Sequence, residues 1–308
     1  MVRVAPALAV PLAALLALAG AACQPEAADR QAAAADDGPP AVEVTARDFA
    51  FEAPDTIPPG WTTLRMENVG AQEHFLVLWR LPDGKGLEDY AAEVGAPFDS
   101  IMGPYRAGAW DRERALATLA ELLPGWYGDV EPASGVGLTD PGRTGETTVR
   151  LRPGTYVMEC YVKTPEGQFH QALGMLRELT VAGTPREASP PEADVRMTLS
   201  NYRIDVEGAP GAGEQVVRVV AAEDPEGLLT HDVHLARTDT AVSVDSVVAW
   251  MDWMDALEAP SAATFVGGAE QMSAGDTAYV RVDLSPGEYA WISEAYGGRG
   301  MVEAFTVE

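Results

Sequence analysis

Short runs in which apolar and polar residues alternate dominate the chain from residue 42 onward. The first are Val42 to Ala46 and Thr63 to Glu67, and the apolar run Phe75 to Trp79 follows them. Glycine and proline separate these runs, and a period of two bounded by turn residues is typical of antiparallel strands. The pattern therefore predicts an all-β sandwich.

A helical segment interrupts the strands. Helices are expected at Leu87 to Val94 and at Asp111 to Leu123, where leucines recur every three or four residues behind the capping residue Asp111. Strands then return at Thr148 to Leu151, Thr155 to Cys160 and Met175 to Val181.

The second half of the chain repeats this order after a proline-rich stretch at residues 183–193. Its predicted elements are strands at Val195 to Ile204, Gln215 to Val220 and His231 to Arg237, a helix at Asp245 to Leu257, and strands at Arg281 to Tyr289 and Gly300 to Val307. Repetition of strand, helix, turn and closing strand indicates an internal duplication. We expect two domains of one architecture, residues 41–182 and 194–308, joined by the linker 183–193.

The composition supports a folded protein and limits its partners. The chain has 308 residues, of which 47% are hydrophobic, enough for two cores. It carries 21 Lys and Arg against 47 Asp and Glu, a formal net charge of -26. Such a surface repels a phosphate backbone, so nucleic acid is excluded as a partner.

The first 23 residues are typical of an export signal. Arg3 precedes an apolar stretch from Leu8 to Leu18, and small residues lead to Cys23. A signal that ends in cysteine resembles the lipobox of bacterial lipoproteins, which implies acylation of Cys23 and a lipid-anchored protein in the periplasm or at the cell surface. Residues 24–40 have the composition of a flexible tether. The alternative is ordinary cleavage near Ala22, which leaves Cys23 free or paired with Cys160.

The candidate chemistry lies at the end of the first repeat. A Pro-Gly-Thr-Tyr turn at residues 153–156 precedes Cys160, and His170 is followed by Gly174 and Met175. This arrangement resembles the ligand loop of the cupredoxin family, the small blue-copper proteins such as plastocyanin and amicyanin. The resemblance implies two tandem cupredoxin-like Greek-key sandwiches, each with a helical insertion.

The same resemblance implies a type 1 copper site with Cys160 as thiolate, His170 and His74 as imidazoles and Met175 as weak axial ligand. Two imidazoles, a thiolate and a long thioether suit both copper oxidation states. An exposed ring edge of His170 would be the port for the electron. Phe75 stands where many family members have Asn, which removes a familiar hydrogen bond near the site.

The second repeat lacks this ligand set. Ser293 stands at the position of Cys160, and without a thiolate a blue-copper centre cannot form. His231 and His234 are three residues apart on a strand, so we expect them to point to opposite faces. This repeat is interpreted as a scaffold or docking domain, with its Trp and Met residues at 250–254 packing the helix.

Three functions remain open at this point. The first is a tethered electron carrier that exchanges electrons with a redox protein through one copper ion, without transforming a substrate itself. The second is a metal-free binding lipoprotein that uses its helical insertions as the contact surface. The third is copper delivery or storage. The chain has no phosphate-binding loop, serine nucleophile elbow or His-Glu-x-x-His zinc motif.

Overall fold

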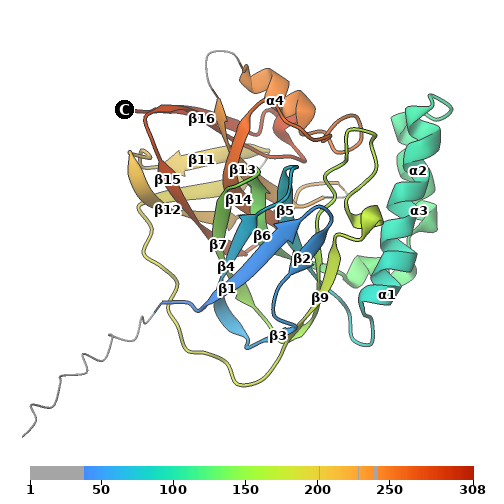
Figure 1. Ribbon diagram of the computed structural model, residues 1–308, viewed down its shortest axis with the longest axis horizontal. Helices are drawn as coiled ribbons and strands as arrows, with labels where there is room; N and C mark the ends of the chain where they lie inside the picture. Colours follow the sequence, from blue (N-terminus) through green and yellow to red (C-terminus); the bar gives the residue numbers. More distant parts are fainter. Residues whose placement is uncertain (1–37, 201, 228, 239–241) are drawn as a thin grey trace, which may run out of the picture. The chain divides into compact units, whose positions relative to one another are not determined.

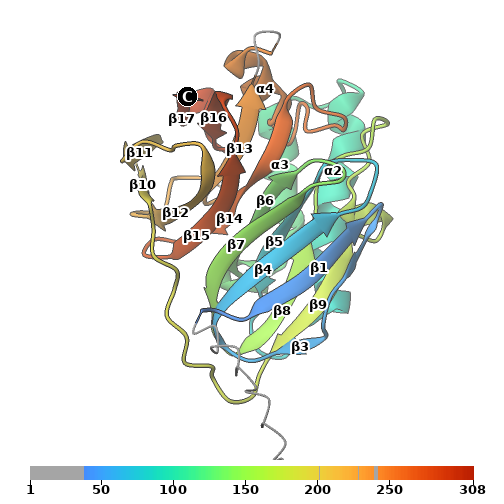
Figure 2. The same ribbon diagram turned by 60° about the vertical axis from the view of Figure 1, so that its left-hand side comes forward.

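The structure is a computed structural model that describes residues 38–308 except 201, 228 and 239–241. The predicted signal peptide, Cys23 and most of the predicted tether lie outside the described residues. The described part consists mainly of two facing mixed β-sheets (Figures 1 and 2). None of its helices has the length and apolar character needed to cross a bilayer.

Nine strands form the first half. They are β1 (Ala41–Arg47), β2 (Ala50–Glu52), β3 (Thr56–Ile57), β4 (Gly60–Asn68), β5 (His74–Arg80), β6 (Glu131–Thr139), β7 (Thr144–Leu151), β8 (Gly154–Glu159) and β9 (Leu176–Val181). The second half has β10 (Val195–Ser200), β11 (Arg203–Glu207), β12 (Gly213–Ala221), β13 (His231–Thr238), β14 (Thr264–Met272), β15 (Thr277–Leu284), β16 (Gly287–Ile292) and β17 (Val302–Val307).

Both sheets run through both halves of the chain. One has the order β11-β10-β12-β15-β7-β4-β1-β2, and the other β17-β16-β13-β14-β6-β5-β8-β9-β3. Each strand of the second half therefore takes the place of a strand of the first, and the halves meet where β7 pairs with β15 and β6 with β14. The expected fold class, two cupredoxin-like sandwiches in tandem, is confirmed.

Matching local contacts also relate the two halves. The Tyr156 hydroxyl donates to the Arg152 carbonyl at 2.7 Å, and the Tyr289 hydroxyl donates to the Ser285 carbonyl at 2.9 Å. Each tyrosine thus fastens the turn that precedes its own strand. This repeated corner supports the duplication inferred from the sequence.

The seam between the halves depends on glycine. A Cβ atom on Gly137 of β6 would lie 2.6 Å from the Gly268 Cα of β14, so the two backbones approach too closely for any side chain there. Strands β6 and β14 were not predicted, because their glycines interrupt the alternation of apolar and polar residues. The seam is nevertheless buried for most of its length.

Helices lie in the insertions between β5 and β6 and between β13 and β14 (Figure 1). The first insertion holds α1 (Leu87–Tyr90), which continues through a π-helical turn (Ala91–Gly95) into α2 (Ala96–Arg106), then α3 (Arg112–Leu122) and a short 3-10 helix (Gly125–Asp129). As predicted, the Asp111 side chain caps α3 by accepting from the Arg114 N–H at 2.8 Å. The helix α2 was not predicted. In the second insertion α4 (Val244–Trp250) is shorter than expected, and a hydrogen-bonded turn follows it.

Candidate metal centre

Three donor residues converge at one end of the first repeat. His74 is the first residue of β5, Cys160 directly follows β8, and His170 precedes a single 3-10 turn at Gln171–Leu173. Strands β5 and β8 are antiparallel neighbours with Val77 opposite Glu159, so the start of one and the end of the other lie at the same edge. The sheet register thereby brings together residues that are 86 positions apart.

The donor atoms face one common point. The Nδ1 atoms of His74 and His170 are 3.1 Å apart, and the Cys160 Sγ lies 3.7 Å and 3.6 Å from them. Atoms bound to one ion at about 2.0–2.3 Å, as nitrogen and sulfur ligands are, lie roughly 3–4 Å from one another. All three side chains are fully buried. The described residues contain no other cluster of three or more His, Cys, Asp or Glu with ligand atoms this close together.

The outer nitrogen of each imidazole has its own partner. His74 Nε2 lies 2.7 Å from the Asp48 carboxylate, and His170 Nε2 lies 3.0 Å from the Gln72 side-chain oxygen. Both partners are acceptors here, so the proton of each neutral ring sits on Nε2 and the Nδ1 lone pair faces inward. The sequence analysis did not identify Asp48 and Gln72 as partners of the imidazole rings. They provide hydrogen bonds near the site, which the Phe75 side chain cannot form.

The ligand loop is closed by backbone hydrogen bonds. The Met175 N–H donates to the His170 carbonyl at 3.0 Å, and the Cys160 N–H donates to the Met175 carbonyl at 3.3 Å. Gly174 makes the tight turn possible with a φ of +112°, a conformation that favours glycine. Met175 is fully buried beside the cluster. Its role as axial ligand remains a prediction.

Burial sets the protonation of the donors. It lowers the pKa of His170 to about 3, and neighbouring His74 adds to this effect. Burial also lowers the pKa of His74, although Asp48 acts against it, and raises the pKa of the Cys160 thiol. Both imidazoles are therefore neutral donors at neutral pH, and a metal ion must displace the proton of the thiol.

One expectation about this site is wrong. His170 was expected to expose a ring edge as the port for the electron, but its side chain is fully buried. Gln72 covers its Nε2 atom, and the Phe49 ring packs on it with centroids 4.7 Å apart. The loops around the site do expose hydrophobic side chains, with Val69 42% and Leu173 41% exposed.

The second repeat follows the expectation from sequence. Ser293 donates its N–H to the Met301 carbonyl at 3.1 Å, so it occupies the place that Cys160 has relative to Met175. His231 lies against the Tyr296 ring, whereas His234 contacts Asp232 and the Leu138 N–H, so the two histidines do not meet. Met251, Trp253 and Met254 are buried, as packing residues should be.

Comparisons with known proteins give structural resemblances only. No family model and no curated protein matches the chain. Auracyanin from Roseiflexus castenholzii is 27% identical over 47% of this chain and 97% of its own, with a TM-score of 0.28. Auracyanin A, a blue copper protein from Chloroflexus aurantiacus, is 24% identical over 47% of this chain and all of its own, with a TM-score of 0.29. A blue copper oxidase from Nitrosomonas europaea is 15% identical over 87% of this chain and 85% of its own, with a TM-score of 0.24.

The sheet topology and the donor set define the class of protein. The chain has a cupredoxin-like fold of two tandem sandwiches. Its first repeat holds the ligand types that a type 1 copper ion takes, two neutral imidazoles and one thiolate.

Proposed function

We propose that this protein is a type 1 copper protein that transfers single electrons through His74, Cys160, His170 and Met175. The observation that carries the proposal is the convergence of two imidazole Nδ1 atoms and one thiol sulfur within 3.7 Å of one another, on three fully buried side chains. Copper supplies a centre that gains and loses one electron with little change of ligands. The fold contributes rigid strands that keep the donor atoms in place.

The surroundings of the site favour electron transfer over copper delivery. Each imidazole is fixed by a second hydrogen bond, and burial leaves no open ligand edge for a copper-receiving protein. A fixed, enclosed site retains its ion. A chelator for Cu(I) should therefore remove copper slowly from the reduced protein, and rapid loss would favour delivery.

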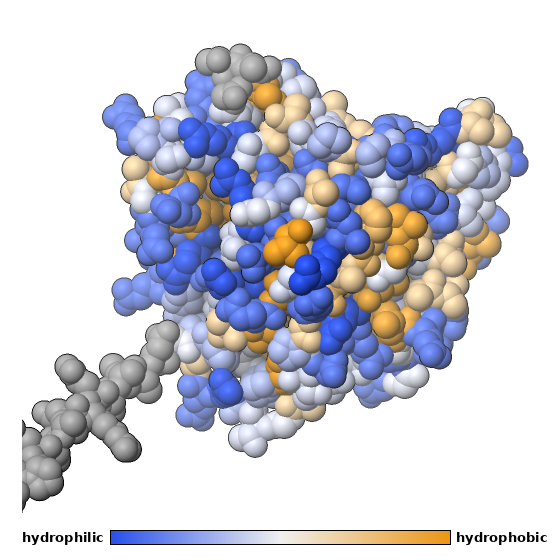
Figure 3. Space-filling view, viewed as in Figure 1, coloured by the Kyte–Doolittle hydropathy of each residue, from blue (hydrophilic) through white to orange (hydrophobic). Residues whose placement is uncertain are grey.

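The partner would be a redox protein that docks beside the site. Among the described residues only three large hydrophobic side chains count as exposed, and two of them, Val69 and Leu173, lie in the loops that lead to His74 and follow His170. On the face shown in Figure 3, hydrophilic residues predominate and hydrophobic residues gather on the side of the helices. An apolar contact next to a buried site shortens the electron path without needing a specific ion pair.

We place the protein outside the cytoplasm. The N-terminal sequence supports export and acylation at Cys23, which would anchor the protein to a membrane in the periplasm or at the cell surface. Labelling with a fatty acid in the producing cell, followed by comparison with Cys23→Ser, tests the anchor.

Metal content and a visible spectrum of the purified full chain test the copper site. We expect one copper ion per chain and the intense visible band of a copper–thiolate bond in the oxidised protein. Cys160→Ser should abolish the band, whereas Cys23→Ser, which changes the other cysteine, should keep it. A colourless protein that takes up no copper would contradict the proposal and leave a metal-free binding module as the function.

A further inference from the structure

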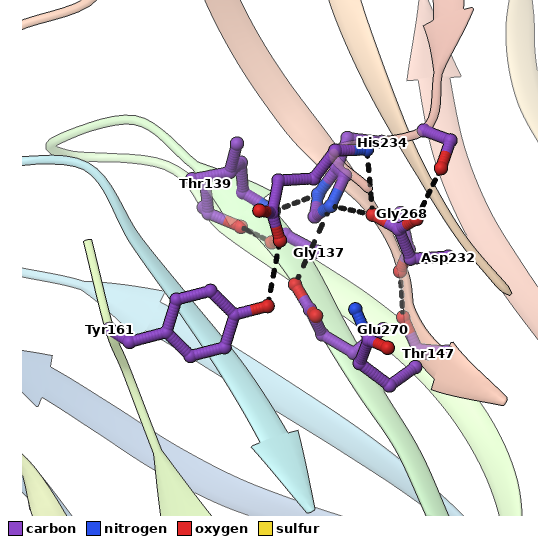
Figure 4. Close-up of polar contacts among 12 residues, drawn as sticks. Gly137, Thr139, Thr147, Tyr161, Asp232, His234, Gly268 and Glu270 are labelled. Carbon is purple, nitrogen blue, oxygen red and sulfur yellow. Dashed lines mark hydrogen bonds and ion pairs between the residues drawn. The ribbon is translucent and has the colours of Figure 1, made fainter. Parts of the chain in front are cut away.

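A second polar cluster lies in the interior beside the copper ligands, and the copper site does not use it. It consists of Asp232, His234, Glu270 and Glu294 from the second repeat, with Tyr161 from the first. Asp232, His234 and Glu270 are fully buried, and Glu294 is 5% exposed. Figure 4 shows the His234 ring between Asp232 and Glu270, with the Tyr161 hydroxyl directed toward the group. Three buried carboxyl groups around one imidazole require neutralisation.

Hydrogen bonds define the state of His234 and Asp232. The Leu138 N–H donates to His234 Nδ1 at 2.9 Å, so this nitrogen is the acceptor and the ring proton sits on Nε2. That proton is donated to the Asp232 carboxylate at 2.9 Å. Asp232 also accepts hydrogen bonds from the Ser293 hydroxyl and the Glu294 N–H. His234 is therefore a donor in this cluster and has no free nitrogen for a metal ion.

Glu270 and Glu294 have fewer hydrogen bonds than Asp232 has. Neither oxygen of Glu270 has a hydrogen-bond partner among the described residues, and its nearer oxygen stands 3.7 Å from His234 Nε2. Glu294 accepts one hydrogen bond, from the Tyr161 hydroxyl at 2.7 Å, and its other oxygen has none. Burial, and then the Asp232 charge, raise the pKa of both glutamates well above the ordinary value. The pair is therefore built to hold a proton.

The cluster is connected to the copper ligands. Tyr161 directly follows Cys160, and its ring packs against Phe75, which follows His74, with centroids 4.5 Å apart. The centroid of the Phe75 ring in turn lies 6.4 Å from the centroid of the His234 ring. After burial and local hydrogen bonds, the Glu270 carboxylate is among the charges that raise the pKa of the Cys160 thiol. A negative charge at Glu270 therefore changes the electrostatic potential at the Cys160 sulfur.

We propose that Glu270 and Glu294 form a proton-binding site that is coupled to the electron on copper. With copper bound, this glutamate pair would take up one proton from solvent when an external one-electron donor reduces the site. When the ion is reoxidised, the proton returns to solvent. The inference rests on the proposed copper site. The groups that face the pair are Asp232 and His234 from β13, Tyr161 and Glu159 from the β8 segment, the Cys160 sulfur, and, near Glu294, the buried Lys163 and the partly buried Asp252.

The reason for the coupling is electrostatic. Reduction removes one positive charge from the copper site, so a nearby buried carboxylate gains affinity for a proton. By linkage, deprotonation of the pair must make reduction less favourable. The carrier would then move a proton together with each electron.

Reduction potentials of the copper-loaded full chain, measured against pH, test the coupling. We expect the potential to fall as pH rises, with a limiting slope of about 59 mV per pH unit for one proton per electron. Glu270→Gln and Glu294→Gln keep the side-chain shape but cannot ionise, so each should reduce the slope. Asp276→Asn is the control, because that partly buried carboxyl also has a raised pKa but lies at the cleft lined by Arg80 and Arg152. It should leave the slope unchanged.

Redox-difference infrared spectra of the unmodified protein provide a readout that needs no variant, because a carbonyl stretch of a protonated carboxyl should appear on reduction. Where Glu270→Gln and Glu294→Gln fold, their spectra should lack this band, which assigns it to the pair. A copper-loaded protein whose potential is independent of pH overturns this inference and leaves the copper site intact. A slope that persists in both variants overturns it as well. Protein that takes up no copper overturns both proposals.

Discussion

The Asp48 carboxylate accepts a hydrogen bond from His74 Nε2 at 2.7 Å, and through its other oxygen it accepts one from the Ala71 N–H at 2.8 Å. One side chain therefore orients an imidazole ligand and fixes the loop that precedes it. Partners of this kind fix the tautomer and the orientation of the ligand ring.

Loss of this partner should weaken copper binding. We expect Asp48→Ala and Gln72→Ala each to lower copper affinity by about 10-fold to 100-fold, because a ring that can rotate no longer presents Nδ1. Competition with a chelator measures the change. Asp55→Ala removes a 92% exposed carboxylate whose side-chain partner is Arg177, and it should leave copper affinity unchanged. Equal affinities for all of these proteins would contradict the assigned role of Asp48 and Gln72.

Substitution of the axial residue should change the potential and keep the colour. In Met175→Leu the thiolate and imidazoles remain, so the visible band should persist. The potential should rise, because the oxidised ion has the higher charge and loses more when a donor is removed. Met301→Leu changes the corresponding buried methionine of the second repeat and serves as the control. An unchanged potential in Met175→Leu would show that the thioether does not interact with the ion.

Stability should depend on pH through Glu159, which accepts hydrogen bonds from Trp79 and Tyr90. Burial raises its pKa from 4.5 to about 7, so the folded state holds a proton that the unfolded chain releases earlier. The proton on Glu159 therefore adds to the free energy of unfolding. This stabilisation is complete below pH 4.5 and is lost as pH rises toward 7, which lowers the free energy of unfolding by roughly 3 kcal/mol. Urea unfolding of Glu159→Gln between pH 4.5 and pH 8 should show a correspondingly weaker pH dependence. A dependence identical to that of the parent protein would exclude this residue as its source.

A charge in the apolar surface near the copper site should slow electron exchange. Val69→Asp and Leu173→Asp place carboxylates in the surface where we propose that two copies, or a partner, meet. We expect electron self-exchange, measured by NMR line broadening of mixed oxidation states, to slow by at least 10-fold. Leu122→Asp is the matched control, since this leucine is 49% exposed and is the last residue of α3, outside the ligand loops in sequence. If all three variants exchange equally, the contact surface lies elsewhere.

The seam between the repeats should tolerate no side chain at Gly137. A Cβ there meets the Gly268 backbone at 2.6 Å, and a backbone cannot move aside as a side chain can. Gly137→Ala should lower the free energy of unfolding by about 3 kcal/mol. Gly128→Ala, with no atom within 4 Å of its new Cβ, should change it by less than about 0.5 kcal/mol. Denaturant midpoints compare the two, and similar values would argue against a tight seam.

Local pattern alone determined much of this protein. Alternation and turn residues predicted most strands, and the capping residue Asp111 placed α3 correctly. The types and order of Cys160, His170 and Met175 predicted a copper ligand loop, and His74 was the only upstream histidine to complete it. These features are local because strand period, caps and loop spacing all act over a few residues.

Only the tertiary structure decided the rest. The glycine-rich strands β6 and β14 lack an alternating signal, and their pairing depends on close backbone contact across the seam. Asp48 and Gln72 became partners of the ligands, and His170 became buried, because separate loops fold over one point. In the sequence, nothing distinguishes Glu270 and Glu294 from the other acidic residues of an acidic chain. Their shared dry environment beside Tyr161 arises only from packing one repeat against the other, which no local pattern encodes.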